Sequence, residues 1–106
     1  MNTRLDHIGN WPELAREANW SSSVLAEKCG VSLRTLERFF LNYSGTNPRA
    51  WLDEQRQRRA IELLKHGLSV KEVANQLAYK DQRHFSHAFK RRNGHAPRQH
   101  PVQFDI

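Results

Sequence analysis

Cysteine is almost absent from this sequence, in which Cys29 stands alone among 106 residues. A lone cysteine rules out an intramolecular disulfide and is typical of proteins that reside in a reducing cytoplasm. Long apolar runs are also missing, since a membrane-spanning helix needs ~20 predominantly apolar residues. The N-terminus has no signal-peptide pattern. We therefore expect a cytoplasmic location and no membrane partner.

Strand signals are equally scarce. Hydrophobic residues make up 38% of the chain, and no segment alternates apolar and polar side chains over the length of a strand. Apolar residues recur instead at intervals of three and four, which is the period of an amphipathic helix. The sequence therefore predicts an all-α fold of about the size of one compact domain.

The motifs of common enzymes are missing too. There is no Gly-rich phosphate loop, no nucleophile elbow and no HExxH zinc motif. His84 and His87 lie three positions apart and could share a metal, with His95 and His100 nearby in the chain. A zinc site needs further ligands and hydrogen bonds that orient them, and Cys29 lies at a position expected to be buried. We predict no catalytic residue, no metal site and no cofactor.

Negative charge is in short supply. The chain has 17 Lys and Arg residues against 11 Asp and Glu residues, which gives a formal net charge of +6. Residues 1–47 are neutral in sum, so the whole excess lies in residues 48–106. This balance indicates a polyanionic partner, although basicity alone does not separate DNA from RNA or a membrane surface.

The few prolines and glycines stand where helices would begin and end. Proline is tolerated at the first helical position, which predicts a helix over residues 12–18. Serines at 21–23 can cap a second helix that ends at Gly30, and Ser32 can cap a third that ends at Gly45. The side chains of the second and third helices expected to face a core are Val24, Leu25, Cys29, Leu36, Phe39, Phe40 and Tyr43.

The second half shows the same punctuation. A long helix is expected over residues 48–66, and residues 69–72 carry the capping-box pattern that starts another. Asp81 can cap a further helix that ends at Gly94, and Pro97 can open a short last turn. The side chains expected to face inward are Trp51, Leu52, Ala60, Ile61, Leu63, Leu64, Val73, Ala74, Leu77, Phe85, Ala88 and Phe89.

An internal repeat relates the two halves. Leu25-Ala26 and Val73-Ala74 lie 48 positions apart, whereas two phenylalanine-containing patterns match at a separation of 49. The positions matched at 49 are Leu36, Phe40 and Gly45 with Phe85, Phe89 and Gly94. Each copy therefore has the pattern of a helix-turn-helix unit, with a slightly longer turn in the second copy. An unrelated helical bundle would explain the helices but not these matched offsets.

The repeat predicts two helix-turn-helix subdomains joined by a long linker helix. The expected division is a lead-in at 1–11, a first subdomain at 12–46, a linker helix at 47–67, a second subdomain at 68–100 and a tail at 101–106. The linker helix would span ~28 Å at 1.5 Å per residue, against ~34 Å between successive major-groove segments on one face of B-DNA. One chain could thus place two recognition helices in successive grooves and bind double-stranded DNA as a monomer.

In such units the outward residues near the start of the second helix meet the base edges. Arginine can contact guanine, glutamine can contact adenine, and glutamate can accept from cytosine. The candidate base-contacting residues are Arg34, Thr35, Glu37 and Arg38 in the first copy, and Gln82, Arg83, Ser86 and His87 in the second.

Other polar residues are candidates for holding the phosphate backbone, which positions a protein without specifying sequence. They are Ser32, Arg56, Lys80, Lys90, Arg91 and Arg92. Simpler interpretations stay open. Arg34 and Glu37 could form an exposed ion pair worth only ~0.3–0.5 kcal/mol, Arg38 could bind phosphate, and residues 90–92 could be a solvated face.

Two further partner classes need comparison with DNA. A helix-turn-helix fold could serve as a protein-interaction module, although arginine on both reading helices favours DNA. RNA is less favoured because its deep, narrow major groove does not admit a helix. An aromatic stacking platform is not evident either, since Trp11, Trp20 and Trp51 suit a core.

Taken together, these residues resemble the AraC/XylS family of bacterial transcription regulators over residues 12–100. The residues that carry the resemblance are Leu25-Ala26, Gly30, Ser32, Leu36-Glu37-Arg38-Phe39-Phe40, Gly45, Arg56, Ala60, Leu63-Leu64, Ser69, Val73-Ala74, Phe85-Ser86, Phe89-Lys90-Arg91, Gly94 and Pro97. The resemblance implies two helix-turn-helix units joined by a long helix, DNA as partner, and transcription control as function. An activator of this kind also contacts RNA polymerase, which is a second candidate partner.

Three positions depart from the family pattern. Ala78-Tyr79 replaces the usual Gly-Phe, so strain is expected in the second turn because alanine adopts positive φ only at a cost. His100 replaces a tyrosine, and Gln57 stands where the family often has an apolar residue, which predicts a looser linker contact. Most members also carry a separate sensing or dimerisation domain, so this chain is expected to be either a minimal regulator or a fragment of a longer one.

Overall fold

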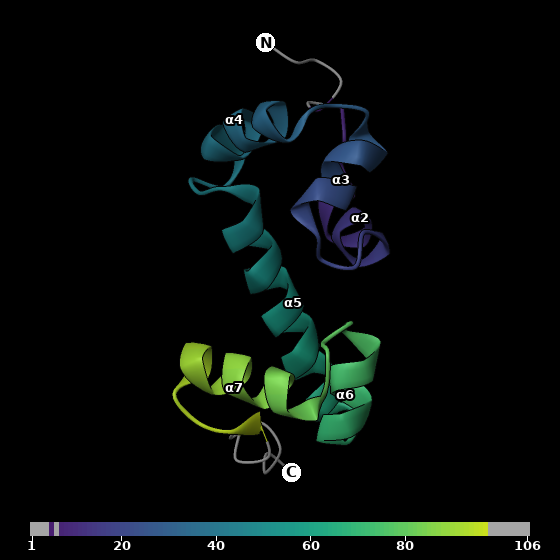
Figure 1. Cartoon of the computed structure of the whole chain (residues 1–106), viewed down its shortest axis with the longest axis vertical. Helices are drawn as coiled ribbons and strands as arrows, with labels where there is room; N and C mark the ends of the chain where they lie inside the picture. Colours follow the sequence, from purple (N-terminus) through teal and green to yellow (C-terminus); the bar gives the residue numbers. More distant parts are fainter. Residues whose placement is uncertain (1–4, 6, 98–106) are drawn as a thin grey trace. The chain divides into compact units, whose positions relative to one another are not determined.

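The computed structural model describes residue 5 and residues 7–97, and these residues form helices without a strand. The helices are α2 (Trp11–Glu17), α3 (Ser22–Cys29), α4 (Leu33–Tyr43), α5 (Pro48–Lys65), α6 (Val70–Gln76) and α7 (Gln82–Asn93) (Figure 1). The all-α prediction is confirmed. The expected short turn after Pro97 and the departure at His100 lie outside the described residues.

The chain divides into two compact units, residues 1–56 and 57–106. The boundary falls inside α5, so the first part of this helix belongs to one unit and the remainder to the other. The helix expected to be a separate linker therefore contributes side chains to both cores, with Trp51 and Leu52 buried in the first unit and Ala60, Leu63 and Leu64 in the second.

An aromatic cluster forms the core of the first unit. Trp11, at the start of α2, packs edge-on against Phe40 of α4 with ring centroids 5.0 Å apart. Phe40 in turn lies 5.1 Å from the ring of Trp51 in α5. Trp11, Phe40 and Trp51 are all at least nine-tenths buried, as is Trp20, so the interpretation of the tryptophans as core residues is confirmed.

Two positions expected to face the core are exposed over a third to a half of their surface. Val24 is 38% exposed and Tyr43 is 48% exposed. The buried face of α3 is formed by Leu25, Ala26 and Cys29. Val24 precedes Leu25 by one residue and lies outside that buried face. Tyr43, in the last turn of α4, stacks on Phe39 with ring centroids 5.5 Å apart and is tilted against Trp11 at 5.8 Å.

The first helix-turn-helix turn follows α3. Gly30 has a φ of 71°, and the Val31 N–H donates to the Ala26 carbonyl at 3.1 Å. This hydrogen bond, with one from the Gly30 N–H to the Glu27 carbonyl at 3.0 Å, closes the helix in a Schellman motif. Ser32 then caps α4 by accepting a hydrogen bond from the Thr35 N–H.

The second turn repeats this arrangement without glycine. The Tyr79 N–H donates to the Ala74 carbonyl at 3.1 Å, and Ala78 has a φ of 62°. The strain expected at Ala78 is thus confirmed, because a left-handed conformation costs a residue with a Cβ roughly 1–2 kcal/mol. Lys80 is the extra residue between this turn and the α7 cap, Asp81, which confirms the prediction of a longer second turn.

The expectation of a loose contact at Gln57 is wrong. Only 5% of Gln57 is exposed, and its amide Nε2 donates to the Tyr79 hydroxyl at 3.0 Å. The amide is therefore well packed, because a polar group in a core is stable there when it finds a hydrogen-bond partner. The two departures from the family pattern, at positions 57 and 79, contact each other.

The capping box at the start of α6 is confirmed. The Ser69 hydroxyl accepts from the Glu72 N–H at 3.1 Å, and Glu72 Oε1 accepts from the Ser69 N–H at 2.8 Å. The hydrogen bond from the Ser69 N–H, followed by the contribution of the Ser69 side chain, holds the pKa of the exposed Glu72 carboxyl below its usual value. The box fixes the first turn of α6, the helix that supports α7.

Three further properties concern the described residues. No helix among them is both long enough and apolar enough to cross a membrane. They contain no group of three His, Cys, Asp or Glu side chains placed to hold a metal ion. Cys29 is buried, and this burial raises the pKa of its thiol.

Candidate nucleic-acid interface

The outer face of α4 carries three charged side chains expected to contact bases. Leu36 and Phe40 are fully buried, and this fixes the rotation of the helix. Arg34, Glu37 and Arg38 are consequently exposed on the opposite face. The structure thus brings these three residues together on one surface, close to the helix start.

The remaining two candidates near this helix start are engaged in its cap. The Ser32 hydroxyl donates to Thr35 Oγ1 at 3.0 Å while it accepts from the Thr35 backbone N–H at 3.1 Å. Thr35 is half-buried. Ser32 and Thr35 therefore stabilise the first turn of α4, and a contact with DNA would add to that role.

Arg34 and Glu37 are not joined to each other. Among the described residues, the ion pairs include Arg59 with Glu62 at 2.9 Å, three positions apart on α5. Arg34 and Glu37 have the same three-residue spacing on α4 but do not form an ion pair. The alternative in which Arg34 serves only a surface ion pair therefore has no support from the geometry.

The outer face of α7 is the second candidate reading surface. Phe85 and Phe89 are fully buried, which leaves Gln82, Arg83 and His87 exposed. Ser86, the remaining candidate on this helix, is half-buried. Arg83 and Arg34 both lie two positions after the N-cap residue of their helix, Asp81 and Ser32 respectively.

His84 has a structural role that the sequence analysis did not identify. Its Nδ1 accepts a hydrogen bond from the Lys80 N–H at 3.3 Å. The ring also stands edge-on against Tyr79, with centroids 5.3 Å apart. His84 therefore ties the second turn to the first turn of α7, and the only sequence signal for this was the four-residue spacing from Lys80.

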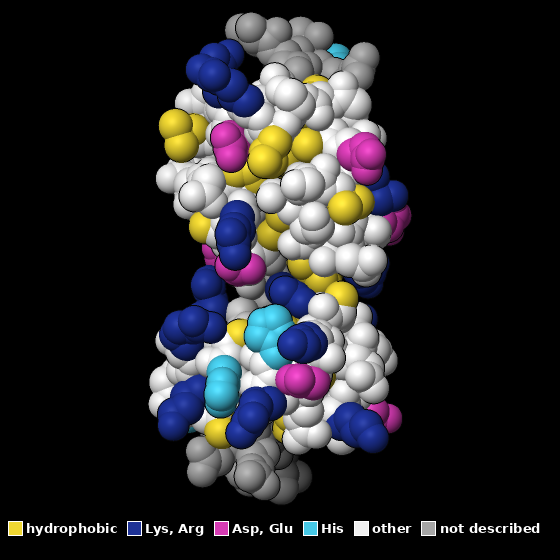
Figure 2. Space-filling view, viewed as in Figure 1, with side chains coloured by type: hydrophobic (Ala, Val, Ile, Leu, Met, Phe, Trp, Pro, Cys, Tyr) yellow, Lys and Arg dark blue, Asp and Glu magenta, His cyan; other side chains and the backbone are white. Residues whose placement is uncertain are grey.

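The unit that holds α6 and α7 has a surface rich in cations, with histidines among the lysine and arginine side chains (Figure 2). Lys90, Arg91 and Arg92 form the basic last turn of α7 and are exposed. Lys80 is exposed in the turn, and Arg56 is half-buried on α5. A cation in the last turn also stabilises a helix by ~0.3–1 kcal/mol through its interaction with the helix dipole. Lys90, Arg91 and Arg92 can therefore stabilise α7 in the absence of DNA.

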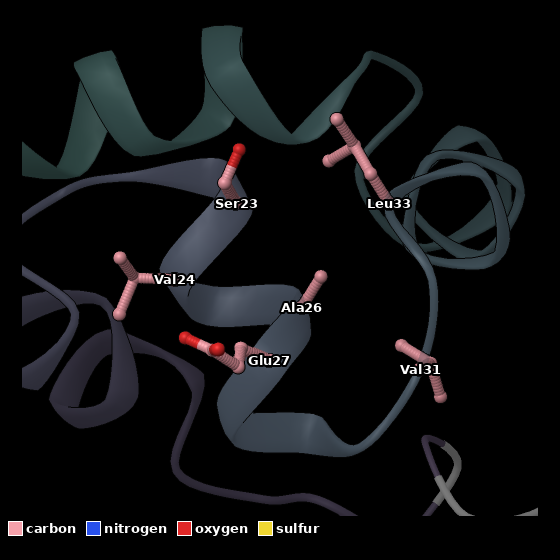
Figure 3. A pocket seen from close by; sticks show the side chains of 6 residues that line it. All are labelled: Ser23, Val24, Ala26, Glu27, Val31 and Leu33. Atoms are coloured by element: carbon pink, nitrogen blue, oxygen red, sulfur yellow. The ribbon is translucent and has the colours of Figure 1, made fainter.

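The first unit has a small open hollow beside its turn (Figure 3). Its volume is ≈ 320 Å³. The side chains that line it come from α3, the turn and the first residue of α4, and are Ser23, Val24, Ala26, Glu27, Val31 and Leu33. Val24 and Leu33 are each 38% exposed there. The sequence pattern alone did not indicate this hollow.

Each unit thus presents an N-capped helix that follows a short turn and carries arginine on its outer face, which defines a helix-turn-helix DNA-binding domain. Residues 25–100 match the family described as "Helix-turn-helix domain". The chain belongs to this family, in its AraC-type branch of transcription regulators.

Two relatives and one solved structure illustrate the likeness. The chain is 32% identical over 104 residues to the virulence regulon transcriptional activator VirF of Yersinia enterocolitica, and the match covers 90% of this chain and 38% of VirF. The chain is also 35% identical over 99 residues to the transcriptional activator RhaS of Escherichia coli O139:H28, and that match covers 91% of this chain and 35% of RhaS. The chain therefore spans less than two fifths of these relatives' lengths.

The solved structure is a transcriptional regulator with an AraC-type DNA-binding domain from Chromobacterium violaceum. It superposes with a TM-score of 0.72 at 28% sequence identity, over 88% of this chain and 85% of that one. The likeness extends over both helix-turn-helix units because the shared region is nearly the whole chain.

Proposed function

We propose that this chain binds double-stranded DNA in a sequence-specific manner and regulates transcription, with α4 and α7 as its two reading helices in successive major grooves. The observation that carries the proposal is the equivalent placement of Arg34 and Arg83. Both are exposed and stand two positions after an N-cap, where a recognition helix contacts base edges.

The chemistry of the two faces suits different base patterns. Arg34 and Arg83 can each donate two hydrogen bonds to guanine O6 and N7, and Glu37 can accept from cytosine N4. Gln82 matches adenine N6 and N7. The side chains of Thr35, Arg38, Ser86 and His87 complete the proposed base-contacting set. Glutamate and glutamine at non-equivalent positions imply that the two helices read different sequences.

A second set of side chains would hold the phosphates. Lys80, Lys90, Arg91 and Arg92 are exposed in the basic unit, and Ser32 and Arg56 are the remaining proposed members. Contacts of this kind dominate affinity and its dependence on salt. Because residues 48–106 carry the entire charge excess, we expect the second unit to supply most of the non-specific attraction.

The proposal extends to assembly and location. Two reading helices on one chain allow binding as a monomer, since a second copy is not required to supply a second helix. A regulator that activates transcription must also contact RNA polymerase, and we propose a surface outside the two reading faces for that contact. Binding to chromosomal DNA would place the protein at the nucleoid in the cytoplasm.

Selection of bound duplexes from a random-sequence DNA library, near physiological salt, tests this function. Enrichment of a sequence motif supports specific recognition. Salt-sensitive binding with no enriched motif would contradict it and would favour the alternative function, a protein-interaction module with little sequence preference. A chain with Lys90, Arg91 and Arg92 replaced by Ala should keep the same motif and bind it more weakly, because phosphate contacts carry no sequence information.

A further inference from the structure

Three polar side chains meet in the core of the second unit. Gln57 of α5 is 5% exposed, Tyr79 of the second turn is 8% exposed, and Asn93 at the end of α7 is half-buried. Gln57 Nε2 donates to the Tyr79 hydroxyl at 3.0 Å, and Gln57 Oε1 accepts from Asn93 Nδ2 at 3.3 Å. Both ends of one buried amide are thus used in hydrogen bonds.

The partners of Gln57 lie at opposite ends of the helix that we propose reads DNA. Tyr79 precedes the α7 cap by two residues, and its ring contacts His84 and Phe85 in the first turn, with centroids 5.3 Å and 5.1 Å away. Asn93 is the last residue of α7 and also donates to the Phe89 carbonyl at 3.0 Å. One side chain of α5 is therefore linked to both the entry and the exit of α7.

Such links constrain orientation in a way that apolar packing does not. Hydrogen bonds weaken steeply away from their preferred distance and angle, whereas apolar contacts are non-directional. A shift or rotation of α7 relative to α5 would separate Gln57 from at least one partner and leave a buried polar group unpaired, which destabilises that placement. The network therefore favours one placement of α7.

We propose that Gln57, Tyr79 and Asn93 are positioning residues that set the orientation of α7 for base recognition, without touching DNA themselves. The proposal rests on the proposed function of α7 as a reading helix. Gln57 and Tyr79 form one buried hydrogen-bonded pair between α5 and the second turn.

Three variants separate positioning from simple stability. Tyr79→Phe removes one hydroxyl, Gln57→Met removes the amide at nearly constant length, and the double variant removes both partners of the pair. Gln76→Met, at an exposed glutamine that ends α6, is the matched control. For each chain we would measure thermal unfolding and the affinity ratio between the selected duplex and duplexes with single base changes. The Arg83→Ala variant identifies the base positions that α7 reads.

We expect both single variants to unfold at lower temperature, because each leaves a buried polar group without its partner. The double variant should regain part of that stability, since both members of the Gln57–Tyr79 pair are then apolar groups of similar shape, while Asn93 keeps its hydrogen bond to the Phe89 carbonyl. Its affinity ratio at the α7 positions should nevertheless stay reduced about fivefold, which is a fraction of the base discrimination that a well-placed bidentate contact provides. Ratios at the positions read by α4 should not change.

An affinity ratio that is unchanged in the folded variants, or that recovers in the double variant together with stability, would overturn the positioning role. Tyr79→Phe alone decides the question if Gln57→Met does not fold, because it deletes a single atom. Comparison of the original chain with Arg83→Ala tests the proposed function separately. If Arg83→Ala relaxes none of the base preferences of the original chain, α7 is not a reading helix and both proposals fail.

Discussion

Lys90 illustrates what a single exposed cation in the last turn of α7 can contribute. It lies away from the first turn, where base edges would be met, so we expect a phosphate contact. Lys90→Ala should weaken binding to all duplexes by the same factor and lower the slope of log affinity against log salt by about 0.9. Lys28→Ala, on α3 of the neutral half, is the control. A changed base preference with an unchanged slope would refute the assignment.

Ala78 and Gly30 occupy equivalent positions in the two turns and have φ values of 62° and 71°. Ala78→Gly should raise the free energy of unfolding by about 0.5–1 kcal/mol, because the relief of left-handed strain exceeds the added chain entropy of glycine. Gly30→Ala should lower it by a similar amount. Thermal and denaturant unfolding measure both changes, and a less stable Ala78→Gly chain would show that the turn is not strained.

Single residues also mark the limit of prediction from sequence. The caps at Ser32, Ser69 and Asp81 were predictable because capping depends on residues within three positions. The partners of Gln57 were not, since they lie 22 and 36 positions away along the chain. The departure from the family pattern indicated a loose contact there, whereas the fold supplied hydrogen-bond partners.

At the scale of elements, the capping box makes the start of α6 sensitive to pH. The pKa of Glu72 is lowered in the folded chain by its hydrogen bonds to Ser69. A lowered pKa means that the ionised form stabilises the fold above the unfolded-state pKa, and that this contribution is lost as the pH falls through the folded-state pKa. Glu72→Gln should therefore lose less stability than the original chain between pH 6 and pH 3.

Unfolding temperatures measured across that range test the contribution of Glu72. Glu13→Gln, at an exposed carboxylate in the first turn of α2, is the control for a general loss of acidic charge near a helix start. Parallel pH profiles for the original chain and the Glu72→Gln variant would contradict the assigned role of the carboxylate.

The packing of α4 depends on one fully buried ring. Phe40 contacts Trp11 and Trp51, so Phe40→Ala should lower the free energy of unfolding by about 3–5 kcal/mol through the cavity it leaves. Its neighbour Leu41 is 63% exposed on the same helix. Leu41→Ala should change stability by less than about 0.5 kcal/mol. Equal losses in the two variants would show that the burial of the α4 faces is misassigned.

Helix order, caps and the repeat were predictable because each depends on short-range patterns of apolar and turn residues. Which apolar residues reach the core was less so. Val24 and Leu25 are adjacent and similar in type, yet Val24 is 38% exposed and Leu25 is fully buried. The same limit applies to the hollow beside the first turn, which forms from residues of α3 and α4 that meet only in the fold.

At the scale of the whole molecule, the two units differ in charge and in apolar exposure. The charge excess lies in residues 48–106, whereas the exposed large hydrophobic residues among the described part of the chain are in the first unit: Val24, Leu33, Leu41 and Tyr43. This division predicts that the second unit dominates the electrostatic attraction to DNA.

We propose that one chain reads DNA with two helices. Duplex selection with the original chain, Arg34→Ala and Arg83→Ala tests this proposal, with Arg16→Ala on the exposed face of α2 as the control. We expect two conserved blocks with centres ~10 base pairs apart. Each reading-helix variant should relax one block only, at a cost of ~1–3 kcal/mol. A single block, or two variants that weaken every sequence equally, would contradict the claim.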